Sequence, residues 1–209
     1  MAGSLSGLRV ALSVDLGGAF EVDDEVAAVV SGSAPVVSAA GAAVEAAHPD
    51  LSLADDTFRT LRAWHFQAKF GRLLAEHPDS FKQSLADNIR LGEALTGADV
   101  ARAYAQRTAL SERMREFFTS YDVLVLPVSQ VPPFPADQEF PAAINGRPMA
   151  TYLDWMRSAY FITVTGCPAI SVPAGRTTTG LPVGVQLVAR HGADRQLLEV
   201  AAAVEALLA

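Results

Sequence analysis

The sequence is poor in the residues from which disulfides, metal centres and lysine-dependent sites are built. It has one cysteine, Cys167, in 209 residues, so no disulfide can close within the chain, and we expect a reducing, cytoplasmic setting. Its four histidines are scattered, without H-E-x-x-H or C-x-x-C spacing. Because metal sites need several ligands close together, we expect no metal and no other cofactor.

Charge is also scarce, and what there is has the wrong sign for anionic partners. Only 19% of the residues are charged, and the net charge is -7. An acidic chain without a dense Lys/Arg cluster is a poor binder of nucleic acid or of anionic membrane surfaces, and we expect neither partner. The uncharged stretch 26–44 consists mostly of Ala, Ser and Gly and contains Pro35, which disfavours a membrane span.

Nucleophiles and bases lack their usual sequence contexts. Only Lys69 and Lys82 are present, both in segments with the pattern of solvated helices, whereas a lysine base must be buried. Ser171 lies between prolines in an apolar run and is interpreted as a buried strand hydroxyl. Asp15-Leu-Gly-Gly18 matches neither G-x-G-x-x-G nor a P-loop. Paired carboxylates such as Asp55 and Asp56 are interpreted as helix starts.

Half of the residues are apolar, which is enough for a packed core, and their periodicity predicts alternating strands and helices. Strands are expected at 8–14, 122–127, 169–172 and 183–188. A helix is expected from Asp23 with a stop or kink at Gly32–Pro35, and further helices at 36–47, 57–76, 79–91, 98–118, 151–160 and 195–208. The run Asp122-Val-Leu-Val-Leu-Pro127 does not alternate, which is typical of a strand covered on both faces.

This order of elements predicts a three-layer α/β/α sandwich. The link between the last two strands is too short for a helical crossover, so they should form an antiparallel hairpin in a mixed sheet. A helical insert at about 50–118 separates the sheet-forming ends. The Pro-rich stretch Val128–Pro148 is expected to be a long functional loop.

Several ordered landmarks carry a family resemblance. They are Tyr121-Asp-Val-Leu-Val-Leu-Pro127, Thr163-Val-Thr-Gly-Cys-Pro-Ala-Ile-Ser-Val-Pro-Ala-Gly175, Gly180-Leu-Pro-Val-Gly-Val-Gln-Leu-Val-Ala-Arg190 and Asp194-Arg-Gln-Leu-Leu198. Together with Gly7–Ala11 and Val22–Val26 they resemble the C-terminal part of the amidase signature family. The resemblance covers nearly the whole chain, is loose over about 50–118, and is interrupted at Gly32–Pro35.

The resemblance implies an incomplete amidase-signature fold, one domain over 1–209. Enzymes of this family hydrolyse carboxamide C–N bonds through a serine nucleophile, a second serine on a cis peptide and a lysine base, beside a Gly/Ser-rich oxyanion loop. The Ser-Lys pair follows the logic of other serine hydrolases, with lysine as the proton acceptor. No Gly-Gly-Ser-Ser-Gly-Gly-like run occurs in this sequence. No catalytic residue is therefore assigned, and the chain is expected to be inactive alone.

Three residues are candidates for substrate binding because, by the same resemblance, the segment Trp155–Cys167 approaches the acyl side of the site. They are Trp155, Thr163 and Cys167, with ordinary packing as the alternative for each. Cys167 is also considered as a reactive thiolate near His191, against the alternative of a small buried residue.

The expected partners are the missing N-terminal half of the fold and, in the full-length enzyme, a small amide substrate. Exposed sheet edges should also favour a homo-oligomer. Two other interpretations stay open at this point. The chain is either a non-catalytic binding or interaction module, which would form a defined complex, or a fragment similar to the A-type component of an amidotransferase, which shares the same landmarks.

Overall fold

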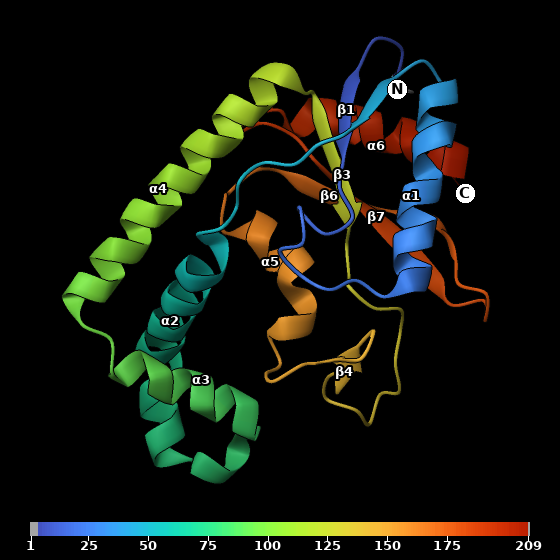
Figure 1. Cartoon of the computed structure of the whole chain (residues 1–209). Coiled ribbons are helices and arrows are strands. Elements are labelled where there is room, and N and C mark those ends of the chain that lie inside the picture. The colour runs from blue at the N-terminus through green and yellow to red at the C-terminus, as the bar shows by residue number, and fades with distance from the viewer. Residues whose placement is uncertain (1–3, 209) are drawn as a thin grey trace.

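The computed structural model describes residues 4–208, so the ends of the expected 1–209 domain lie outside the described part. Its main feature is a five-stranded sheet in the order β2-β1-β3-β7-β6 (Figure 1). The strands are β1 (Arg9–Leu12), β2 (Ala43–Ala46), β3 (Val123–Pro127), β6 (Ala169–Arg176) and β7 (Pro182–Val188). β1 runs parallel to β2 and β3, whereas β7 is antiparallel to β3 and β6. The predicted mixed sheet and its final hairpin are confirmed.

Helices lie on both faces of the sheet. α1 (Asp24–Ala39) and α6 (Asp194–Leu208) cover one face, and α5 (Arg157–Thr163) lies on the other (Figure 1). The Gln186 side chain of β7 reaches α5 and donates a hydrogen bond to the Ser158 carbonyl at 3.2 Å. All five residues of β3 are buried because both of its faces are covered, as its unbroken apolar run predicts.

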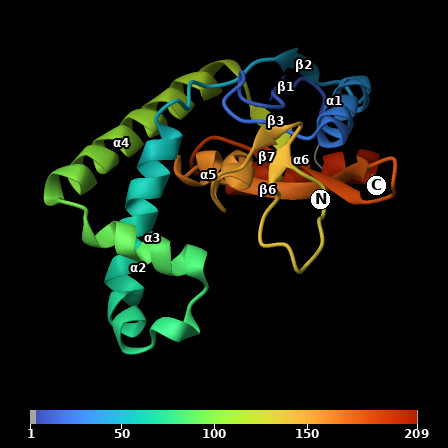
Figure 2. The same ribbon diagram turned by 60° about the horizontal axis from the view of Figure 1, so that its bottom comes forward.

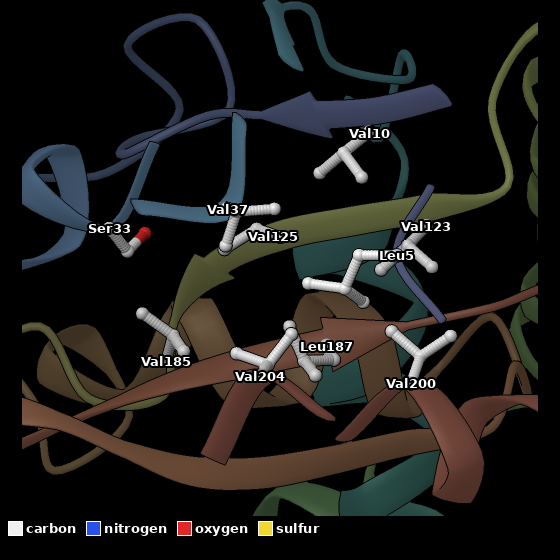
Figure 3. A pocket seen from close by; sticks show the side chains of 10 residues that line it. All are labelled: Leu5, Val10, Ser33, Val37, Val123, Val125, Val185, Leu187, Val200 and Val204. Atoms are coloured by element: carbon white, nitrogen blue, oxygen red, sulfur yellow. The ribbon is translucent and has the colours of Figure 1, made fainter. Parts of the chain in front are cut away.

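The α1/α6 layer packs on the sheet almost without gaps. Figure 3 shows the one small space between them, about 10 Å³, lined by nine apolar side chains and Ser33. The Ser33 hydroxyl already donates to the Val30 carbonyl at 2.6 Å. A space of this size and apolarity is a packing void, too poor in polar partners to hold a water.

The structure corrects the prediction for residues 32–47. α1 runs without interruption through Pro35 to Ala39, with Asp23 as its N-cap. Its apolar face, which includes Val26, Val30 and Val37, is buried. The expected second helix is wrong beyond that point, because Gly41 (φ +96°) turns the chain and 43–46 pairs with β1 as β2. Ladder pairing outweighs the helix propensity of this Ala-rich segment.

Helices account for most of residues 54–120, and they extend away from the sheet (Figure 2). They are α2 (Ala54–Glu76), the 3₁₀ turn η1 (Pro78–Ser80), α3 (Gln83–Glu93) and α4 (Gly97–Ser120). α3 approaches α2 closely at Gly92, where a Cβ atom would lie 2.3 Å from the Ala63 carbonyl oxygen. Thr96 and Asp99 form a capping box that starts α4. Within residues 4–208, no helix is both long and apolar enough to cross a membrane.

The expected loop at 128–148 contains a small hairpin, β4 (Ala143–Ile144) and β5 (Arg147–Pro148). Its turn is Asn145-Gly146, and both residues have positive φ, +48° and +80°. This dipeptide is a strong hairpin signal because both central positions of a type I′ turn need positive φ. The Asn145 side chain also donates to the Val22 carbonyl at 2.8 Å, which ties the hairpin to the segment before α1. The predicted helix at 151–160 is replaced by the 3₁₀ turn η2 (Asp154–Met156) followed by α5.

Candidate functional site

A hollow of about 290 Å³ opens where β3 ends and the Pro-rich loop begins. Trp155 from η2 forms one wall, and Ser171 from β6 and Gly184 from β7 form another. The remaining lining residues are Val26, Val128, Ser129, Val131, Pro132, Pro133, Phe134, Pro182 and Val183. Mostly apolar walls with a few polar groups are typical of sites for small organic ligands.

Trp155 is the most distinctive side chain of this hollow. Its ring meets Phe134 edge to face, with centroids 5.2 Å apart, and Tyr152 in the same way at 6.0 Å. Its indole Nε1–H is buried and has no hydrogen-bond partner. Because a buried indole N–H usually finds an acceptor, this wall presents an unmet donor beside the hollow.

Gln130 holds the Trp155 segment in place. Its fully buried side chain donates to the carbonyls of Glu21, at 2.8 Å, and Asp154, at 3.1 Å. Its Oε1 accepts from the amides of Arg157, at 2.5 Å, and Ser158, at 3.4 Å. Two of these contacts flank Trp155 in the chain, so one amide side chain fixes the backbone on both sides of it.

A second polar cluster fastens α2 to η2 and α5. Arg59 contacts Asp55 at 2.8 Å and Asp154 at 2.7 Å, and Arg157 contacts Asp154 at 2.9 Å. The Tyr160 hydroxyl donates to Asp55. Asp55 was interpreted from sequence as a helix start; it lies in the first turn of α2 and also joins this cluster.

The charges in this cluster shift two pKa values in opposite directions. Burial, reinforced by the neighbouring Asp55 carboxylate, raises the pKa of the Tyr160 phenol. Burial opposes ionisation of Asp154, but the Thr151 amide and the Arg59 and Arg157 charges outweigh it and lower its pKa. Both residues therefore keep the protonation states that the cluster requires at neutral pH.

The structure separates the three candidate residues. Trp155 lies in the wall of the hollow, whereas Thr163 and Cys167 are not among its lining residues within 4–208. Thr163 is exposed at the end of α5, and its hydroxyl donates to the Ala159 carbonyl at 3.1 Å. Cys167 is buried, and burial raises the pKa of its thiol, which disfavours the thiolate alternative.

Sequence reasoning missed other members of this site. Ser171 was interpreted as a buried strand hydroxyl, but it is exposed and lines the hollow. Gln130 and Phe134 were passed over, because nothing in a Pro-rich loop marks which residues turn inward. The spacing of prolines around 131–135 was the only available signal that this loop forms a wall.

The comparisons with known proteins decide the family, since a model of the amidase family matches residues 1–198. The chain belongs to the amidase family. The resemblance seen in the landmarks of the sequence is thereby confirmed, and the observed mixed α/β fold agrees with it.

Relatives of this amidase-family chain include an acylamidase of Rhodococcus erythropolis, 34% identical over 208 residues, which span 98% of this chain and 43% of that enzyme. The A-type component of the glutamyl-tRNA(Gln) amidotransferase of Alkaliphilus metalliredigens is 27% identical, over 95% of this chain and 42% of that protein. A solved bacterial aryl acylamidase of the amidase signature family has the same fold, with a TM-score of 0.85 and 24% identity, over 98% of this chain and 44% of that one. The chain thus spans less than half the length of these relatives.

Proposed function

We propose that this chain is the C-terminal part of a carboxamide hydrolase and provides the wall of its substrate site. In this proposal the serine nucleophile, the second serine and the lysine base come from the remaining part of the amidase fold, which the chain does not span. The substrate is a small amide, and its acyl portion lies against Trp155. A cytoplasmic location stays a prediction.

The observation that carries this proposal is the combination of family membership with partial coverage. The chain matches the amidase family over residues 1–198, yet it covers 43% of the acylamidase relative. Its two lysines, Lys69 and Lys82, are exposed, which does not suit a base whose pKa must be lowered by burial. The hollow beside Trp155 offers a place for a ligand but no nucleophile–base pair.

The edge of β6 supports a docking surface for the remaining part. β6 ends the sheet, is eight residues long and carries no charge before Arg176. The edge at the other end, β2, is four residues long and carries Glu45, a charge that discourages pairing. Alternate β6 residues Ala169, Ser171 and Pro173 are exposed. Because Ser171 also lines the hollow, a polypeptide that covers β6 would place its groups beside Trp155.

Activity assays of the purified chain test this proposal. We expect no hydrolysis of a simple anilide by the chain alone, and hydrolysis when the unmatched part of the Rhodococcus erythropolis acylamidase is supplied as a separate polypeptide. Ser171→Lys should weaken that association, while Ala46→Lys on the exposed part of β2 should not. Steady turnover by the chain alone, abolished by a serine-directed inhibitor, would overturn the proposal.

The size of the gene product in its source cells is an independent test. An intact mass well above 22.1 kDa is expected, with a Gly/Ser-rich segment before Leu8. A mass equal to this chain would favour the second candidate, a non-catalytic module that acts within a complex. The similarity to the A-type component of an amidotransferase supports a multi-subunit variant of the same proposal, which glutamine-dependent ammonia release would separate from plain amide hydrolysis.

A further inference from the structure

Arg62 on α2 is a half-buried cation without a counter-charge. Its guanidinium lies over the Phe66 ring at 4.2 Å and near the Phe58 ring at 5.9 Å. Its Nε–H is buried and has no hydrogen-bond partner. Burial lowers the Arg62 pKa, and among the residues of 4–208 only Tyr152, not a carboxylate, offsets this effect. Stacking on aromatic rings leaves the edge of the guanidinium, where its donors point, unused.

Arg59, one turn earlier on the same face of α2, shows what a satisfied arginine is like here. It has about the same burial environment but contacts two carboxylates, Asp55 at 2.8 Å and Asp154 at 2.7 Å. A structural role for Arg62 would need only the apolar stem and the ring contacts. The retained planar donor set, buried and unpaired, instead matches a group that meets its acceptor on binding.

The surroundings of Arg62 connect it to the proposed substrate wall. Tyr152, its charge neighbour, also contacts the Trp155 ring, and Trp155 lines the hollow. Trp155 Nε1 is a second buried donor without an acceptor. Two unmet donors therefore flank Tyr152, with apolar rings around them. This arrangement suits an anionic oxygen group at the end of an apolar chain.

We propose that Arg62 is a specificity-determining residue that binds a carboxylate on the acyl portion of the substrate, remote from the amide bond that is cleaved. The preferred substrates are then amides of dicarboxylic acids or of similar acids that carry a free carboxylate. This inference rests on the proposed amidase function for the word substrate, but carboxylate binding by Arg62 is measurable without turnover.

Trp64→Phe leaves Trp155 as the only tryptophan and turns its fluorescence into a binding signal. In this background the probes are hexanoate and its neutral analogue hexanamide. We expect hexanoate to bind about ten-fold more tightly, the scale of one charge-assisted contact. Arg62→Gln should bring the two affinities together, and Arg62→Lys should keep part of the preference. Arg72→Gln, an exposed arginine on the same helix, is the matched control and should change nothing.

Equal affinities of hexanoate and hexanamide for the parent protein overturn the inference, as does a failure to bind either probe. A preference that survives in Arg62→Gln also overturns it. The Arg62→Lys variant and the parent measurement decide the question even if Arg62→Gln does not fold. None of these results touches the proposed amidase function, which turnover by the complemented chain decides separately.

Discussion

Replacing Gln130 should destabilise the whole site wall, and the structure sets the size of the effect. Gln130 is fully buried, and its amide makes three hydrogen bonds of 3.1 Å or less, to Glu21, Asp154 and Arg157. Gln130→Leu keeps most of the volume but leaves two carbonyls and an amide N–H unpaired away from water. At about 1–1.5 kcal/mol for each lost bond, the variant should lose about 3–5 kcal/mol of unfolding free energy.

Urea unfolding followed by circular dichroism and by tryptophan fluorescence measures this loss. Gln138→Leu is the control, because Gln138 is an exposed glutamine on the same loop and should change stability by no more than about 0.5 kcal/mol. Trp155 fluorescence should change in the folded Gln130→Leu variant, since Gln130 fixes the backbone on both sides of that residue. A loss below about 1 kcal/mol would refute the view that Gln130 is the tie of this wall.

Three further predictions concern the core, the polar cluster and the thiol. Leu187→Ala should enlarge the void beneath α1 and α6 and cost about 2–5 kcal/mol in urea unfolding, whereas Leu181→Ala at the partly exposed start of the hairpin should cost much less. Because the pKa of Asp154 is lowered in the folded state, its contribution is present above the ordinary Asp pKa of about 3.9 and is lost as pH falls through the folded value; Asp154→Asn should therefore be less stable at pH 7 and flatten this part of the acid unfolding curve, and an unchanged curve contradicts the assignment. Because burial raises the pKa of Cys167, iodoacetamide should alkylate it slowly at pH 7 and quickly only in urea, and rapid labelling of the folded protein would restore the thiolate alternative.

Patterns of neighbouring residues were enough to predict elements whose local and tertiary preferences agree. The apolar run of β3 predicted a strand with two covered faces, and its five residues are all buried. The short link after β6 predicted the antiparallel hairpin with β7, since a crossover helix cannot fit there. The expected helix at 98–118 differs from α4 by one or two residues at each end. The motifs around these elements also carried the family.

Predictions failed where contacts between distant residues decide the outcome. Residues 43–46 are rich in alanine and form β2 only because β1 offers a parallel ladder. α1 continues through Pro35 because its buried face packs on the sheet and one missing donor is a small loss by comparison. Ser171 alternates with a buried neighbour on β6, so it is exposed, although its immediate sequence suggested burial.

The sequence by itself therefore determined the family, the mixed α/β sandwich and the order of its elements, because these depend on periodicity and on Gly and Pro positions that act locally. Only the tertiary structure decided which side chains form the site wall. Gln130 reaches Glu21 across 109 residues, and Arg59 reaches Asp154 across 95. The environment of Arg62, with aromatic rings on one side and no carboxylate on the other, arises from the packing of α2 beside Tyr152. No local pattern encodes such pairings, because they follow from where the folded chain brings distant segments together.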